Sequence, residues 1–100
     1  MSIKKKLISI PLTSLDFYTY EKDGIQYIEY DARECSPPEP MVNTINALKM
    51  LQDDTSKLVG KFFHEPFPLY ERIAPHFSYT AKELESGDFE IIFTRKKNNQ

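Results

Sequence analysis

The sequence predicts an α+β two-layer sandwich, with two helices on one face of a mixed four-stranded sheet in the order β-α-β-α-β-β. A helical apolar pattern over residues 37–52 lies between two strand-like segments, which indicates a parallel strand pair joined by a right-handed crossover. The last two strands flank Ser86-Gly87 as an antiparallel hairpin, so the sheet must be mixed. Two helices in a chain of 100 residues can cover only one sheet face.

Residues 1–24 are predicted to extend this fold as a strand or a hairpin arm, before the main domain at residues 25–97 and a polar tail at residues 98–100. Within the extension, residues 3–10 can form a strand that Pro11 ends or confines to a sheet edge. The alternative is a loosely held N-terminal segment.

Asp23-Gly24 predicts a hairpin turn, because aromatic and β-branched residues alternate on both sides of it. We therefore expect a strand at residues 25–30 with a partner at residues 17–21.

The first long helix is expected to begin with a capping box, in which Ser36 and Glu39 each satisfy a backbone N–H of the other. Pro37 fits the first helical position, where the missing N–H costs nothing. Apolar residues then recur at helical spacing and predict one buried stripe: Met41, Ile45 and Leu48.

The second half of the chain has the pattern strand, helix, strand, strand. Residues 58–63 are an apolar run typical of a buried strand. Pro68 can open a helix, and Pro75 limits that helix to about two turns. Alternating apolar and polar residues at 88–95 indicate a half-buried strand paired with residues 78–85.

Composition excludes several classes of protein. One cysteine excludes an internal disulfide and a four-cysteine zinc site. No apolar run approaches the ~18 residues of a membrane span, and Lys4-Lys5-Lys6 precedes too short an apolar stretch for a signal peptide. We expect a cytoplasmic protein. The net charge of −2 and the absence of an interior basic stripe argue against nucleic-acid binding.

Asp31-Ala32-Arg33, followed by Pro38-Glu39-Pro40 at the start of the first helix, resembles the TusA/SirA-like sulfur-carrier superfamily, whose motif is close to D-x-R-G-x-x-C-P-x-P. The similarity covers residues 26–95. It implies a two-layer sandwich with a mixed four-stranded sheet, which agrees with the order of elements given above.

The departure from that motif concerns the reactive residue. The superfamily's persulfide-carrying cysteine falls at Pro37, which has no nucleophile. Together with His64-Glu65-Pro66-Phe67-Pro68, this absence resembles an uncharacterised branch of the superfamily that lacks the cysteine. The resemblance thus implies the fold without the sulfur chemistry.

Cys35 is the one remaining candidate for sulfur chemistry. A helix N-terminus can lower a thiol pKa, and Arg33 would add to this effect, whereas Asp31, Glu34 and Glu39 would oppose it. We favour the alternative, in which Cys35 packs as a small apolar residue.

Four residues are candidates for binding: Arg33, Ser36, Glu39 and His64. A helix N-terminus beside Arg33 outlines an anion site, but the prolines remove donors, so pairing of Arg33 with Asp31 or Glu39 is the favoured alternative. His64, Glu65 and His76 lack a tight ligand spacing, so we predict no metal site.

The function expected from the sequence is a non-catalytic interaction or regulatory module without a cofactor. The sheet face without helices would contact a protein partner or a second copy, with some of Tyr27, Tyr30, Tyr79 and Phe89 on it. The alternative is a diverged sulfur-relay protein that carries a persulfide on Cys35.

Overall fold

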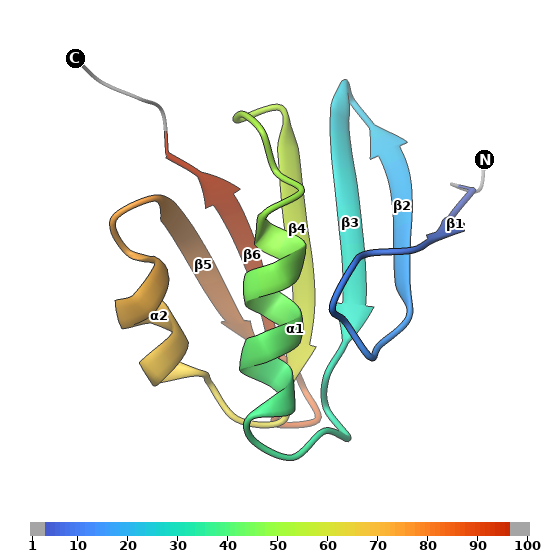
Figure 1. Cartoon of the computed structure of the whole chain (residues 1–100). Helices are drawn as coiled ribbons and strands as arrows, with labels where there is room; N and C mark the ends of the chain where they lie inside the picture. The colour runs from blue at the N-terminus through green and yellow to red at the C-terminus, as the bar shows by residue number, and fades with distance from the viewer. Residues whose placement is uncertain (1–3, 97–100) are drawn as a thin grey trace.

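The computed structural model describes residues 4–96, which form one mixed sheet with two helices on the same face (Figure 1). The elements in chain order are β1 (Lys6–Ile8), β2 (Phe17–Lys22), β3 (Ile25–Asp31), α1 (Glu39–Leu48), β4 (Ser56–Phe62), α2 (Phe67–Ile73), β5 (Phe77–Glu83) and β6 (Phe89–Arg95). The predicted fold class, with both helices covering one face, is confirmed.

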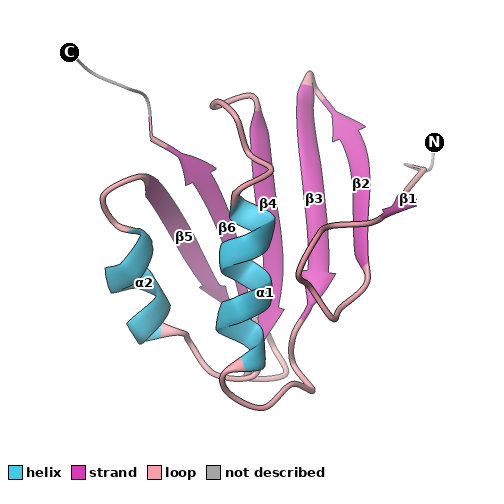
Figure 2. Cartoon of the chain, in the orientation of Figure 1, coloured by secondary structure: helices cyan, strands magenta, loops and turns pink. Residues whose placement is uncertain are grey.

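The sheet has six strands in the order β1-β2-β3-β4-β6-β5, so the predicted number of four is wrong (Figure 2). β3 and β4 are parallel, as the crossover through α1 predicts, and all other neighbours are antiparallel. The two additional strands come from the N-terminal segment. Asp23 and Gly24 have φ angles of 55° and 79°, which allow the tight turn that pairs β2 with β3.

The segment between β1 and β2 is held against α1, so the loosely held alternative is wrong for the described part of the N-terminal region. Ile10 and Phe17 are buried in the core. The Asn43 side chain, on α1, accepts hydrogen bonds from the backbone N–H groups of Ser14 and Leu15 at 2.8 and 3.1 Å. Asn43 also donates to the Ser14 hydroxyl at 3.0 Å. These bonds join residues that are 28 and 29 positions apart, a link that no local pattern reveals.

The core contains a row of aromatic rings that crosses four strands. Tyr30 of β3 lies 4.9 Å from Phe17 of β2 and 6.0 Å from Phe62 of β4, between ring centroids, and Phe93 of β6 follows at 6.4 Å from Phe62. The Tyr30 hydroxyl is hydrogen-bonded to Thr44 on α1. Burial raises the pKa of Tyr30, so this hydroxyl stays protonated.

Gly60 on β4 provides the space for the Tyr30 ring. A Cβ atom at position 60 would lie 2.7 Å from both the Cζ atom and the hydroxyl oxygen of Tyr30, and 2.8 Å from the Phe62 ring. Gly60 is therefore required here because the rings pack against its backbone.

The start of α1 differs from the predicted capping box. α1 begins at Glu39, after Pro38 at the N-cap, and no side chain caps it. Pro37 and Ser36 each precede a proline, which disfavours helical dihedral angles at both positions. The Ser36 carbonyl accepts from the Glu39 N–H at 2.9 Å, while the Glu39 carboxylate accepts from the Ser14 hydroxyl at 2.5 Å.

The second half of the chain follows the prediction closely. α2 has seven residues, or two turns, and buries Leu69, Tyr70 and Ile73. The Tyr70 ring stacks on Tyr79 of β5 at 3.6 Å between centroids, which holds α2 against the sheet. Among residues 4–96, neither helix is long and apolar enough to cross a membrane.

We expect Gly60→Ala to lower the free energy of unfolding by about 1–3 kcal/mol, because the buried Tyr30 and Phe62 rings must shift to admit the methyl group. Urea unfolding followed by circular dichroism measures this loss. Thr80→Ala, on the exposed part of β5, is the control and should change stability by less than about 0.5 kcal/mol. A Gly60→Ala protein as stable as the parent would show that the rings can move freely.

Asn43→Ala should destabilise the protein by about 1–3 kcal/mol, because the N–H groups of Ser14 and Leu15 lose their acceptor. Amide hydrogen exchange should accelerate at residues 9–16 more than at β5 and β6. Asn46→Ala, which removes an exposed bond to the Leu12 carbonyl, is the comparison and should cost less. Equal losses for the two variants would contradict a special role for Asn43.

Candidate functional site

An apolar cleft of about 290 Å³ lies where the chain enters α1 and α2. Its lining comes from the loop after β3, the first turn of α1, the end of β4 and the loop into α2. The lining residues are Ala32, Cys35, Pro37, Pro38, Pro40, Met41, Phe62, Phe63, His64, Glu65, Pro66, Pro68 and Leu69. Of the described residues that line it, Glu65 is the single carboxylate, and none is a lysine or arginine.

The ends of two adjacent strands place the walls of the cleft. Ala32, directly after β3, is buried and donates its N–H to the Lys61 carbonyl of β4 at 2.8 Å. The Cys35 N–H donates back to Ala32 at 3.3 Å, which turns the chain towards α1. Phe62 forms the buried floor at the end of β4, and Phe63, 59 % exposed, forms the rim.

Five of the seven prolines in the chain line this cleft. Proline has no N–H, so the walls offer carbonyl oxygens and carbon but few donors. At the start of α1, the Glu39 N–H is already bonded to Ser36 and the Val42 N–H to Pro38. Among the first-turn residues of α1, Pro38 and Pro40 have no N–H and the Glu39 N–H is in use, so this helix start offers an anion fewer donors than an ordinary one.

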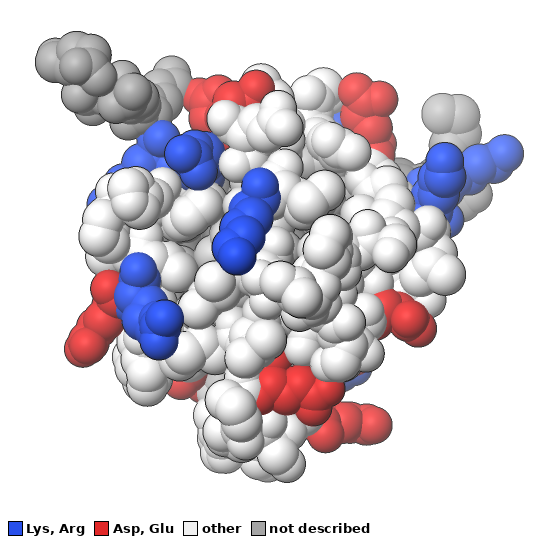
Figure 3. Space-filling model, in the orientation of Figure 1, with Lys and Arg blue, Asp and Glu red and all other residues white. Residues whose placement is uncertain are grey.

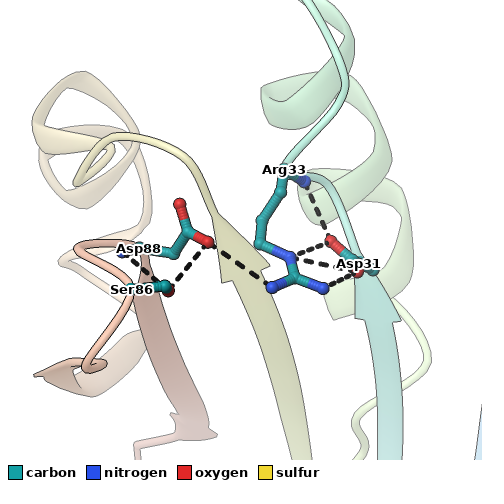
Figure 4. Close-up of polar contacts among 4 residues, drawn as sticks. All are labelled: Asp31, Arg33, Ser86 and Asp88. Carbon is teal, nitrogen blue, oxygen red and sulfur yellow. Dashed lines mark hydrogen bonds and ion pairs between the residues drawn. The ribbon is translucent and has the colours of Figure 1, made fainter.

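Arg33, a predicted anion-binding residue, is paired within the protein (Figure 4). Its guanidinium donates to Asp31 through Nη2 at 2.7 Å and through Nε at 3.0 and 3.1 Å, and Nη1 donates to Asp88 at 3.4 Å. These bonds lower the pKa of the Asp31 carboxyl and raise that of Arg33. Arg33 thus joins the end of β3 to the β5–β6 turn. Its pairing with Asp31 is the structural alternative that the sequence favoured, while Glu39 bonds to Ser14 instead.

Cys35 lies in the cleft lining and is half-buried. Burial raises the pKa of its thiol, and the negative charge of Glu39 raises it further, with smaller contributions from Asp31 and Glu34. The thiol is therefore protonated at neutral pH. A helix N-terminus by itself would shift the pKa the other way, so the prolines and carboxylates outweigh it.

His64 and Glu65 lie in the cleft wall, while His76 follows the opposite end of α2. The His64 ring is exposed and packs against Phe63 at 4.4 Å between centroids. Glu65 accepts a hydrogen bond from the Tyr70 hydroxyl at 3.0 Å. Over residues 4–96, no three His, Cys, Asp or Glu side chains are grouped to hold a metal ion.

The sheet face without helices carries a wider, charged groove of about 610 Å³. Of the aromatic residues expected on this face, only Tyr27 lies there, stacked on Tyr20 at 5.1 Å. Tyr30, Tyr79 and Phe89 lie on the helix side: Tyr30 is buried, Tyr79 stacks on Tyr70, and Phe89 packs on the core. Tyr18 and Tyr20, which alternate with buried Phe17 along β2, line the groove instead and were not predicted.

The structure therefore brings together some of the predicted site residues and separates one. Cys35 and His64 line the cleft, Ser36 and Glu39 lie at the adjoining start of α1, and Arg33 is paired elsewhere. Sequence reasoning did not identify the cleft itself. The available signal was the pair of proline-rich stretches that precede the two helices.

Comparison with models of protein families finds a match to this chain. The family model described as "Uncharacterized conserved protein (DUF2249)" matches residues 29–95, from within β3 to the end of β6, which includes every residue of the cleft. No curated protein and no solved structure matches the chain. Because the match covers more than half of its length, this chain belongs to the DUF2249 family.

Proposed function

We propose that the protein is a non-catalytic interaction module that binds an apolar segment of a partner protein in the proline-lined cleft. The observation that carries this proposal is the cleft itself, an almost wholly apolar depression with an exposed phenylalanine, Phe63, at its rim. Exposed apolar concavities of this kind are typical of places where a protein buries part of another molecule.

The cleft is preferred over the open sheet face because binding there removes fewer charges from water. The groove on the open face is lined by Lys5, Glu29, Lys61 and Glu90, among other charged residues. Burying unpaired charges is costly, whereas the cleft has only Glu65. Lys5 and Glu29 already form an ion pair at 3.0 Å, and a contact through the open face would have to take this pair and the other charges out of water.

The resemblance to TusA/SirA-like proteins supports the same proposal. The order β3-α1-β4-α2-β5-β6 is the order implied by that resemblance, and the cleft adjoins the position of the superfamily's reactive cysteine. Pro37 replaces that cysteine. We therefore propose a relative that keeps a surface for contacts and lacks the persulfide carrier.

A diverged sulfur relay through Cys35 is the second candidate, favoured by the position of that thiol in the cleft lining. Its raised pKa opposes this role, because the thiolate is the nucleophile in sulfur transfer.

We expect no persulfide on Cys35 when the protein is incubated with a cysteine desulfurase and cysteine, since the thiol is protonated at neutral pH. Mass spectrometry of the intact protein measures the added sulfur, with Cys35→Ser as the background. Alkylation of Cys35 by iodoacetamide should be slower than that of a free cysteine peptide at pH 7 and should accelerate as the pH rises. Sulfur bound to Cys35 but not to Cys35→Ser would favour the relay.

Binding in the cleft is tested with a neutral peptide, acetyl-Ser-Leu-Leu-Gln-Gln-Ser-amide, and protein labelled with ¹³C at the methionine methyl groups. The Met41 methyl lies in the cleft lining, while Met50 follows the far end of α1 and serves as an internal control. We expect the peptide to shift the Met41 signal and not that of Met50.

Phe63→Ala should weaken this binding at least about fivefold, or about 1 kcal/mol, because the exposed ring at the rim covers the bound side chain. Phe67→Ala is the matched control, since Phe67 is equally exposed but does not line the cleft. No shift at Met41, or equal weakening by both substitutions, would contradict the proposed site.

A further inference from the structure

We propose that the cleft selects partner segments in which apolar side chains stand next to lysine or arginine, and rejects those next to aspartate or glutamate. This inference rests on the proposed function and specifies the chemistry of the partner. It follows from two properties of the described residues around the cleft: the sign of the charges at its edge, and its size.

The walls of the cleft contain few backbone donors, because five prolines line it. Three of the five proline carbonyls already accept bonds within the fold: Pro38 from Val42, Pro40 from Thr44, and Pro66 from Leu69 and Tyr70. The walls therefore discriminate little between charged groups, and the selection depends on the charges at the edge of the cleft.

The fixed charges near the cleft are negative. Glu65 lines it, Glu39 begins α1, and Glu34 lies in the loop between Arg33 and Cys35. Acidic side chains are visible on the lower part of the helix-bearing face, where α1 begins (Figure 3). Burial is the largest cause of the raised pKa of the Cys35 thiol, and the negative charges of Glu39, Asp31 and Glu34 raise it further.

The nearest cation does not offset these carboxylates. Arg33 has three bonds to Asp31 and one to Asp88, so its charge is already neutralised within the fold. Opposite charges at the rim of an interface mainly determine which partner binds, whereas the apolar contact supplies the affinity.

The size of the cleft favours side chains over a bound cofactor. Its volume of about 290 Å³ lies at the lower limit of the ~300–1,000 Å³ typical of small-molecule pockets. Its rim is open to solvent at Phe63, which is 59 % exposed.

The inference is tested by comparing three peptides that share the Leu-Leu pair and differ in the two following residues: Arg-Arg, Gln-Gln or Glu-Glu. Dissociation constants come from titration of the Met41 methyl signal, with Met50 as the internal control. At about 0.02 M salt we expect the Arg-Arg peptide to bind at least about fivefold more tightly than the Gln-Gln peptide, and the Glu-Glu peptide to bind more weakly than either. At about 0.5 M salt the three constants should agree within about twofold, because charge interactions are then screened.

Matched variants identify the carboxylates responsible. Glu34→Gln combined with Glu65→Gln should reduce the preference for the Arg-Arg peptide over the Gln-Gln peptide to within about twofold. Glu21→Gln removes one charge at the other end of the sheet and should leave the preference intact. Gln can still accept the bond from Tyr70, so Glu65→Gln preserves the packing of α2.

The outcomes separate the two proposals. If all three peptides shift Met41 equally at low salt, or if the Glu-Glu peptide binds best, the charge preference is wrong and the apolar site stands. If none of the three shifts Met41, the proposed function and the inference fail together. If the preference survives Glu34→Gln with Glu65→Gln but not high salt, it does not come from these carboxylates and the inference is wrong.

Discussion

The packing of the Tyr30 ring on the backbone of Gly60 connects the centre of this fold, where β2, β3, β4 and α1 meet. The ring touches Phe17 of β2 and Phe62 of β4, and its hydroxyl is bonded to Thr44 on α1. A side chain at position 60 would occupy the space of the ring. Because α1 is thus fixed against β3 and β4, the loops at its start are also fixed, and the cleft takes its shape from them. The position of the site is a consequence of the core.

Proline determines the chemical character of that site. A helix N-terminus usually presents free N–H groups and a partial positive charge, which attract anions and stabilise thiolates. Here Pro38 and Pro40 remove donors, Ser36 and Pro38 carbonyls take up others, and Glu39 adds a negative charge. The same residues leave an apolar wall beside the first turn of α1.

The N-terminal strands show how a small domain completes its core. The family match begins within β3, so β1 and β2 lie outside it, yet Ile10 and Phe17 are buried against the matched part. A chain of 100 residues buries only a modest fraction of its surface, so two more strands and a loop beside α1 add useful apolar contact. The side chain of Asn43, on α1, fixes that loop through hydrogen bonds to Ser14 and Leu15.

Elements specified by neighbouring residues could be predicted from the chain alone. The Asp23-Gly24 turn, the short α2 and the terminal hairpin depend on local dihedral preferences and periodicity, and all three are found. The predicted stripe of α1 is found only in part: Leu48 is buried and Met41 and Ile45 are partly buried, whereas the polar residues Asn43 and Thr44 are buried because they bond to other elements. The hydrogen-bond partner of a side chain could not be predicted in this way, because several groups compete for the bond and the group that forms it can lie anywhere in the sequence. Glu39 bonds to Ser14 in place of Ser36, Asn43 reaches Ser14 and Leu15, and Arg33 reaches Asp88 across 55 positions. The addition of β1 and β2 to the sheet and the formation of the cleft have the same origin, because both depend on contacts that exist only in the folded arrangement.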